Sequence, residues 1–172
     1  WESIDRILSK TYVQQHAEAK ALEKKISDLQ SHLEVTFQRF LDRENFKDCK
    51  KVNIYIEYTD QRPRIELKPF DPFCQWSSET KSVFKEAKQM KLELEDELLG
   101  NIKILPYIIP IRDELQNKDV IKKGKLGDND LQGFYVYRNN RLIQYGGWFG
   151  MVKVEPHITR LRVLFEFDES LD

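Results

Sequence analysis

The hydrophobic pattern of this chain changes once, from a helical period to an extended one, and this change limits the folds it can adopt. Residues 11–43 contain no glycine or proline, and their apolar positions fall three or four residues apart. This spacing predicts one long helix, and its second half should be the buried half because most apolar side chains lie there. Residues 1–8 form a second helical pattern, with Ser3 at the N-cap position.

Four later segments have the residue pattern of β-strands. Residues 52–58 and 64–68 alternate apolar and polar side chains around a turn, which predicts an antiparallel hairpin. Residues 101–110 are rich in β-branched side chains and predict a buried strand that ends at the second proline. Residues 160–167 alternate again, which predicts a strand with a mainly polar face formed by Arg160, Arg162, Leu164 and Glu166.

Two further segments differ in how clearly their pattern can be interpreted. Residues 133–145 predict two strands joined at Asn139 and Asn140, because asparagine tolerates the left-handed backbone of a tight two-residue turn. Residues 82–95 contain Glu, Lys and Leu, which favour a helix, whereas the apolar residues between 90 and 94 alternate as in a strand. We interpret residues 89–95 as a strand, with a helix as the alternative.

Together these patterns predict an α+β fold. We expect a mainly antiparallel mixed sheet, a long N-terminal helix packed on one face of it, and at least one further helix. Residues 1–45 would be a helical segment, and residues 46–172 would form the α+β domain. Because the chain begins at Trp1 rather than at a methionine, we expect it to be a piece of a longer protein.

The composition excludes several classes of protein. Twenty-eight basic and 29 acidic residues give a net charge of −1, so any site for a polyanion must be local. No apolar stretch is long enough to cross a membrane, so we expect no membrane partner. Cys49 and Cys74 are too few for a disulfide framework or a four-ligand zinc site, which predicts a reducing, cytoplasmic location.

Sequence motifs of enzymes are absent. The chain has no GxxxxGK, GxGxxG, HExxH or GxSxG motif. Its three histidines, His16, His32 and His157, do not have the spacing of metal ligands. We therefore predict no catalytic residue and no metal site within this chain.

Basic residues are concentrated in two places. Arg138 and Arg141 flank the predicted turn, where two guanidinium groups could bind the same phosphate. The alternative, which the hairpin alone favours, is two solvated turn arginines or a salt-bridged pair. The second cluster lies in a glycine-containing loop and consists of Lys122, Lys123 and Lys125. These lysines could bind an anion, or the loop could be only a flexible connector.

The same hairpin carries a resemblance to a known family. The run LQGFYVYRNNRLIQYGGWFG, with RLRVLFEF after it, resembles the second domain of bacterial ATP-binding proteins of the GHKL class (gyrase, chaperone, histidine kinase and MutL type). The likeness is strongest to the MORC-like branch found near restriction-modification and phage-defence genes. LEVTFQRFLD, VNIYIEY with RIELKPFDPF, and ILPYIIP resemble further stretches of that family in the same order.

The resemblance implies a transducer domain, of the type shared with a small-subunit ribosomal protein, behind an N-terminal ATPase domain. ATP and magnesium would bind to that ATPase domain, which would precede Trp1, and this chain would hold no cofactor. A basic residue of the second domain would reach the γ-phosphate. The nucleotide-sensing candidates are the basic residues Arg138, Arg141, Lys122, Lys123 and Lys125, together with the neutral Asn140 in the turn. The MORC-type lysine after the aromatic pair is replaced by Asn139, and a histidine after ILPYIIP is replaced by Ile111.

Two other functions compete with this one. A nucleic-acid-binding module would use a sheet face formed by Arg160 and Arg162, with Arg138, Arg141, Tyr135 and Tyr137, and its partner would be DNA. Alternatively, the polar half of the long helix, residues 14–25, would be a coiled-coil arm through which the protein forms a homodimer.

Overall fold

The computed structural model describes residues 15–75, 83–84, 88–94, 97–110 and 131–167. Residues 1–8, for which we expected a helix, lie outside these ranges. Two helices come first, α1 (Gln15–Thr36) and α2 (Gln38–Leu41). The strands are β1 (Tyr55–Ile56), β2 (Ile65–Glu66), β3 (Val83–Phe84), β4 (Lys88–Leu94), β5 (Glu97–Ile108), β6 (Gly133–Arg138), β7 (Arg141–Tyr145) and β8 (Leu161–Phe167). A 3-10 helix spans Pro156–Ile158.

The main sheet is mixed and largely antiparallel, as the sequence predicted. Its order is β3-β5-β8-β6-β7, and β4 also pairs with β5. Only the β6 and β8 pair is parallel among the described strands. The strand interpretation of residues 89–95 is confirmed by β4, whose long antiparallel ladder with β5 overrides the helix propensity of Glu and Lys.

The long helix differs from its prediction at its C-terminal end. It stops at Thr36, and after Phe37 the chain forms the separate short helix α2. This break turns Gln38 and Arg39 into the protein, where the Tyr137 hydroxyl donates to Gln38 Oε1 at 3.2 Å. Asp42 then ends α2, because its Oδ1 accepts hydrogen bonds from the backbone N–H groups of Glu44 and Asn45.

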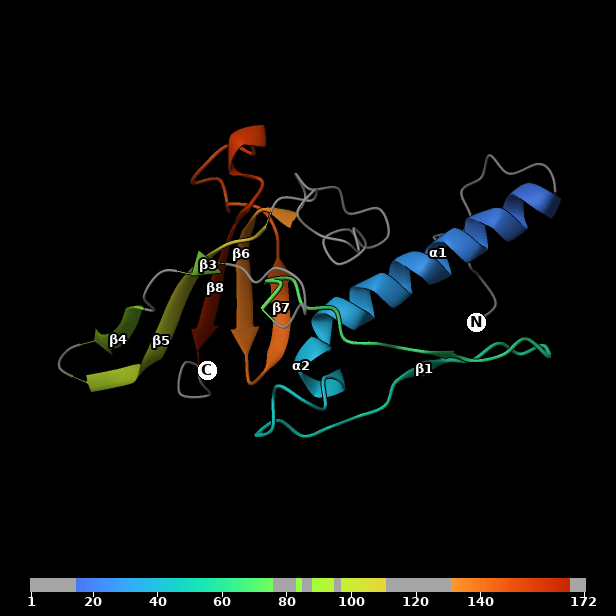
Figure 1. Ribbon diagram of the computed structural model, residues 1–172, viewed down its shortest axis with the longest axis horizontal. Coiled ribbons are helices and arrows are strands. Elements are labelled where there is room, and N and C mark those ends of the chain that lie inside the picture. The colour runs from blue at the N-terminus through green and yellow to red at the C-terminus, as the bar shows by residue number, and fades with distance from the viewer. Residues whose placement is uncertain (1–14, 76–82, 85–87, 95–96, 111–130, 168–172) are drawn as a thin grey trace.

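Helix α1 contacts the main sheet only near its C-terminal end, and its N-terminal part projects away from the sheet (Figure 1). The prediction that the long helix packs on one face of the sheet therefore holds only for that end. The predicted hairpin is confirmed, since β1 and β2 pair antiparallel, but it forms a small sheet of its own. This hairpin extends on the same side of the molecule as α1 (Figure 1) and is joined to it by Glu34, which accepts a hydrogen bond from Lys68 N–H at 3.1 Å. The second half of α1 is the buried half, as predicted.

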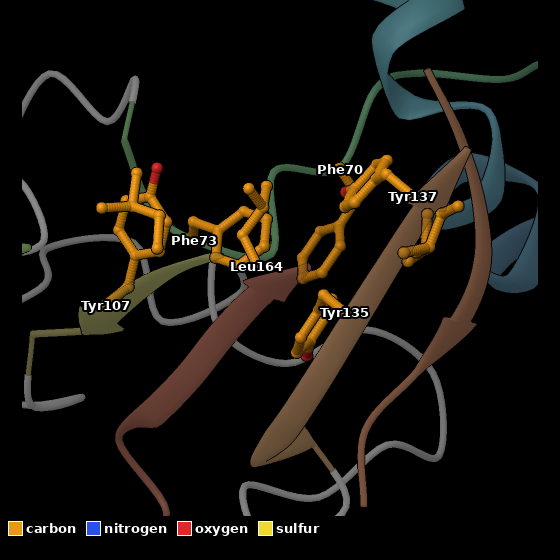
Figure 2. Close-up of a cluster of buried hydrophobic side chains, with 9 residues drawn as sticks. Phe70, Phe73, Tyr107, Tyr135, Tyr137 and Leu164 are labelled. Atoms are coloured by element: carbon orange, nitrogen blue, oxygen red, sulfur yellow. The ribbon is translucent and has the colours of Figure 1, made fainter. Parts of the chain in front are cut away.

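An aromatic cluster fills the core (Figure 2). Phe73 lies at its centre, with ring centroids 4.6 Å from Tyr107 and 5.1 Å from Tyr135. The buried members are Val35, Phe70, Phe73, Leu105, Tyr107, Tyr135, Tyr137, Leu142 and Leu164. The irregular segment that carries Phe70 and Phe73 therefore covers one face of β5, β6 and β8.

The prediction for the two faces of β8 was wrong. Arg162 is fully buried and Leu164 is 3% exposed, whereas Leu161 and Val163 on the opposite face are only partly buried. The segment with Phe73 crosses the face that we expected to be polar, and Arg162 Nη1 donates to the backbone carbonyl of Pro72. Alternation in the sequence identified the strand but not which of its faces would be covered.

We predict that Phe73→Ala destabilises the chain by about 3–5 kcal/mol, because it removes a fully buried ring from the centre of the aromatic cluster. Urea unfolding followed by circular dichroism measures this change. Phe149→Ala is the matched control, since this ring is 57% exposed and should contribute little. Equal effects of the two substitutions would contradict the central position of Phe73.

We predict that alkali destabilises the fold. Burial raises the pKa of the Cys74 thiol to about 11 and raises the pKa of both Tyr107 and Tyr135 to about 12. The folded state holds these protons more tightly than the unfolded state, so this stability is fully present below the unfolded pKa values and is lost as pH rises.

Urea midpoints measured at increasing pH should stay level up to about pH 9 and then fall steadily toward pH 12. Cys74→Ala should reduce the first part of this fall, because the variant has no thiol to ionise. A midpoint that stays constant in the alkaline range would show that these groups remain solvated.

Candidate anion-binding site at the β6–β7 turn

The turn between β6 and β7 has the backbone that the sequence predicted. Asn139 and Asn140 have φ angles of 48° and 65°, and Arg138 pairs with Arg141 across the turn. Left-handed backbone at both central residues matches the right-handed twist of the two strands. The turn consequently projects two arginines from one end of the sheet.

The two arginines are held differently. Arg141 is exposed, and its guanidinium lies 5.6 Å from the centre of the Phe37 ring, which is a cation–π distance. Arg138 is partly buried. Phe37 occupies the break between α1 and α2, so this break places an aromatic face beneath one of the two predicted sensor arginines.

Both arginines line a hollow of about 510 Å³ between the helices and β7. The hollow is lined by residues of α1, α2, β6, β7 and the turn between these strands. They are His32, Thr36, Phe40, Arg138, Asn139, Arg141, Leu142 and Ile143. This lining holds two permanent cations and a histidine but no carboxylate. The hollow therefore suits an anion such as a phosphate, next to a small apolar wall.

A second hollow, of about 570 Å³, lies against the same turn. It is lined by Asn101, Ile102, Lys103, Asn139, Asn140, Glu166 and Phe167. Because it contains the Glu166 carboxylate beside a single lysine, it lacks the positive charge of the first hollow. We therefore assign anion binding to the hollow between the helices and β7.

Asn140 has a structural contact that the sequence did not reveal. Its Oδ1 accepts a hydrogen bond from Arg39 Nη1 at 3.0 Å, and Arg39 also forms an ion pair with Glu166. The Arg39 guanidinium lies 4.1 Å from the centre of the Tyr137 ring. Arg39 thus ties α2 to the turn and to the end of β8.

Other predicted residues are not brought to this site. Lys122, Lys123 and Lys125 lie outside the described residues. The prediction that Arg162 lies on a nucleic-acid-binding surface was wrong, because Arg162 is 0% exposed and its guanidinium lies in the core near the Tyr135 ring. Tyr135 and Tyr137, predicted on the same surface, are fully buried as well. Arg160 is exposed, but its Nε donates to the Ile109 carbonyl at 2.7 Å.

Sequence reasoning missed Arg39, His32 and Thr36 as parts of the site. A charged residue between Phe37 and Phe40, in the most apolar part of the helix, was the available indication that Arg39 has a buried partner. His32 and Thr36 lie one helical turn apart, with Nε2 and Oγ1 at 3.5 Å, and their position above β7 depends on how α1 packs.

Across the described ranges, no cluster of three or more His, Cys, Asp or Glu side chains could hold a metal ion, and no helix has the length and apolar character needed to cross a membrane. Comparisons of the chain with protein-family models, curated proteins and solved structures gave no match. The function must therefore be argued from the site itself.

We predict that Arg39 and Glu166 stabilise the fold as a coupled pair. Glu166→Gln and Arg39→Met should each cost about 1–3 kcal/mol, because either change leaves a polar partner poorly satisfied in a mostly buried place. The double variant should cost clearly less than the sum of the two. Urea unfolding of the four proteins gives this coupling energy, and strict additivity would show that the pair contributes nothing.

Proposed function

We propose that this chain is a non-catalytic transducer domain of a GHKL-type ATPase. In this role it would sense the phosphate groups of ATP, bound with magnesium in an adjoining ATPase domain, and convert their presence into movement. The observation that carries the proposal is the positively charged hollow at the β6–β7 turn, with Arg138 and Arg141 on its wall. The resemblance of this hairpin to the MORC-like branch agrees with that role.

The chemistry of the turn supports phosphate sensing. A guanidinium group keeps its charge at all physiological pH values and donates hydrogen bonds in a fixed fork that matches phosphate oxygens. Arg141 is exposed at the end of the sheet, where a second domain could approach it. A side chain that contacts phosphate only when two domains close would shift their equilibrium by the free energy of that contact.

The surroundings of the turn support a mechanical output. The hollow is shared between the turn and the C-terminal end of α1, through Arg141, His32 and Thr36. Arg39 joins the turn to α2, which follows α1 after the single residue Phe37. A displacement of the turn would therefore act on the base of a 22-residue helix that projects from the sheet.

We predict that Arg141→Ala and Arg138→Ala lower ATP turnover in the protein that carries the ATPase domain. Removing an arginine that stabilises transferring phosphate costs about a thousandfold or more in related chemistry, so a loss of at least about tenfold is expected for the sensor. Arg141→Lys should keep part of the activity because the charge remains.

Arg64→Ala is the matched control, because Arg64 is an exposed arginine on the β1–β2 hairpin, where it lies over Tyr55. It should leave turnover unchanged. The 172-residue chain alone should hydrolyse no ATP. Unchanged turnover in both turn variants would refute the sensor assignment, and hydrolysis by the chain alone would refute the non-catalytic role.

A further inference from the structure

Residues 151–157 form an exposed segment between β7 and β8. Every residue in it is exposed, including the apolar Met151, Val152 and Val154 at 66%, 50% and 55%. The segment lies in the red-orange part of the chain that extends beyond the end of the main sheet (Figure 1). Neighbouring apolar side chains that remain in contact with solvent indicate a surface that binds a partner.

One buried side-chain amide anchors this segment. Gln132 is 0% exposed, and its Nε2 donates to the Glu155 carbonyl at 3.1 Å while its Oε1 accepts from the Glu155 N–H at 3.3 Å. The indole Nε1 of Trp148 donates to the same Oε1 at 3.1 Å. The corner from Trp148 to Glu155 is therefore fixed at both ends before any partner arrives, which reduces the entropy that binding would cost.

The amide of Gln132 bonds Glu155 as a neighbouring β-strand would. Glu155 has extended backbone, with φ −132° and ψ 145°. Successive residues of an extended chain direct their N–H and C=O groups to opposite sides, so we expect those of Val154 to point away from Gln132. Neither backbone group of Val154 has a hydrogen-bond partner within the part of the chain that the structure describes. Val154 therefore presents the free side of a short strand edge.

We propose that a second copy of this chain pairs with residues 152–156, which we call the edge segment, in antiparallel orientation about a two-fold axis at Val154. The Val154 N–H of each copy would donate to the Val154 carbonyl of the other. Each copy uses the same surface, as in most symmetric dimers. The segment follows Gly147, which pairs with Gly133 at the start of β6, whereas the arginine turn lies at the other end of β6, so this proposal is independent of phosphate sensing.

The charges of the edge segment match those of a second copy. In this register Lys153 lies opposite Glu155 of the second copy, and Glu155 lies opposite Lys153, which gives two pairs of opposite charge. On the other face Val154 meets Val154, and Val152 lies opposite Pro156. The segment is therefore complementary to itself.

The same charges select the register. A shift of one copy by two residues is the smallest that keeps Val154 hydrogen-bonded, because a shift by one would bring in the backbone groups that face Gln132. The shift by two places Lys153 opposite Lys153, or Glu155 opposite Glu155, depending on its direction. Like charges directly opposite each other destabilise a pair of strands.

The first test measures the mass of the full 172-residue chain by sedimentation equilibrium at increasing concentration. So short a contact predicts weak association, with a dissociation constant between about 10 µM and about 1 mM. The mass should therefore rise from that of one chain toward that of two over this range. A mass that stays at one chain up to the highest concentration would overturn the proposal.

The second test exchanges the charges. Lys153→Glu and Glu155→Lys should each raise the dissociation constant more than about tenfold, because each change converts both opposite-charge pairs into like-charge pairs. An equal mixture of the two variants should associate at least as tightly as the wild type, since every carboxylate at these positions then faces an ammonium group. A mixture that associates no better than either variant alone would overturn the proposal.

Lys47→Glu is the matched control, because it makes the same change of charge at an exposed position after α2. It should leave the dissociation constant unchanged. Equal weakening by Lys47→Glu and Lys153→Glu would show that net charge, and not the edge segment, governs association, which would also overturn the proposal.

The third test fixes the register by disulfide cross-linking. Val154→Cys should form a disulfide-linked dimer on mild oxidation, because directly opposite residues of a hydrogen-bonded pair have Cα atoms about 5.5 Å apart. Val152→Cys is the control, since this equally accessible position faces Pro156 and not itself. The native Cys49 and Cys74 are buried, so the wild-type chain supplies the background. Cross-linking of Val152→Cys that equals or exceeds that of Val154→Cys would overturn the two-fold axis at Val154.

Discussion

The guanidinium of Arg39 is the contact on which the arrangement of this domain depends. It lies over the Tyr137 ring, pairs with the Glu166 carboxylate and donates to Asn140 at the β6–β7 turn. The Arg39 guanidinium therefore connects α2 with β6, the β6–β7 turn and β8. Because a mostly buried charge is costly without partners, losing any one of these contacts should destabilise the whole arrangement.

A second buried cation shows how polar groups are accommodated in this core. Arg162 donates to the Pro72 carbonyl and lies 5.9 Å from the Tyr135 ring centre, but its Nε and Nη2 atoms meet no acceptor in the described part of the chain. An aromatic ring, rather than a carboxylate, therefore lies next to this buried guanidinium. The same preference recurs at the turn, where Arg141 lies over Phe37.

Local patterns in the sequence predicted the elements well. The period of the apolar residues identified α1, the hairpin and β8, and the paired asparagines identified the turn. Patterns also placed Arg138 and Arg141 on either side of that turn. They failed where partners distant in the sequence decide the outcome, as when the segment with Phe73 covers the Arg162 face of β8, or when Arg39 draws the helix end toward Glu166.

Neighbouring residues alone were enough to predict most of the helical and extended segments and the turn at Asn139 and Asn140, because these features depend on local pattern. They were not enough to predict where α1 ends. Long-range packing determines which face of β8 is buried, that Asn140 accepts a hydrogen bond from Arg39, and that His32 and Thr36 line one hollow with the two turn arginines. These outcomes depend on contacts between residues about a hundred positions apart, such as Arg39 with Asn140, and alternation along one strand looks the same whichever of its faces is covered.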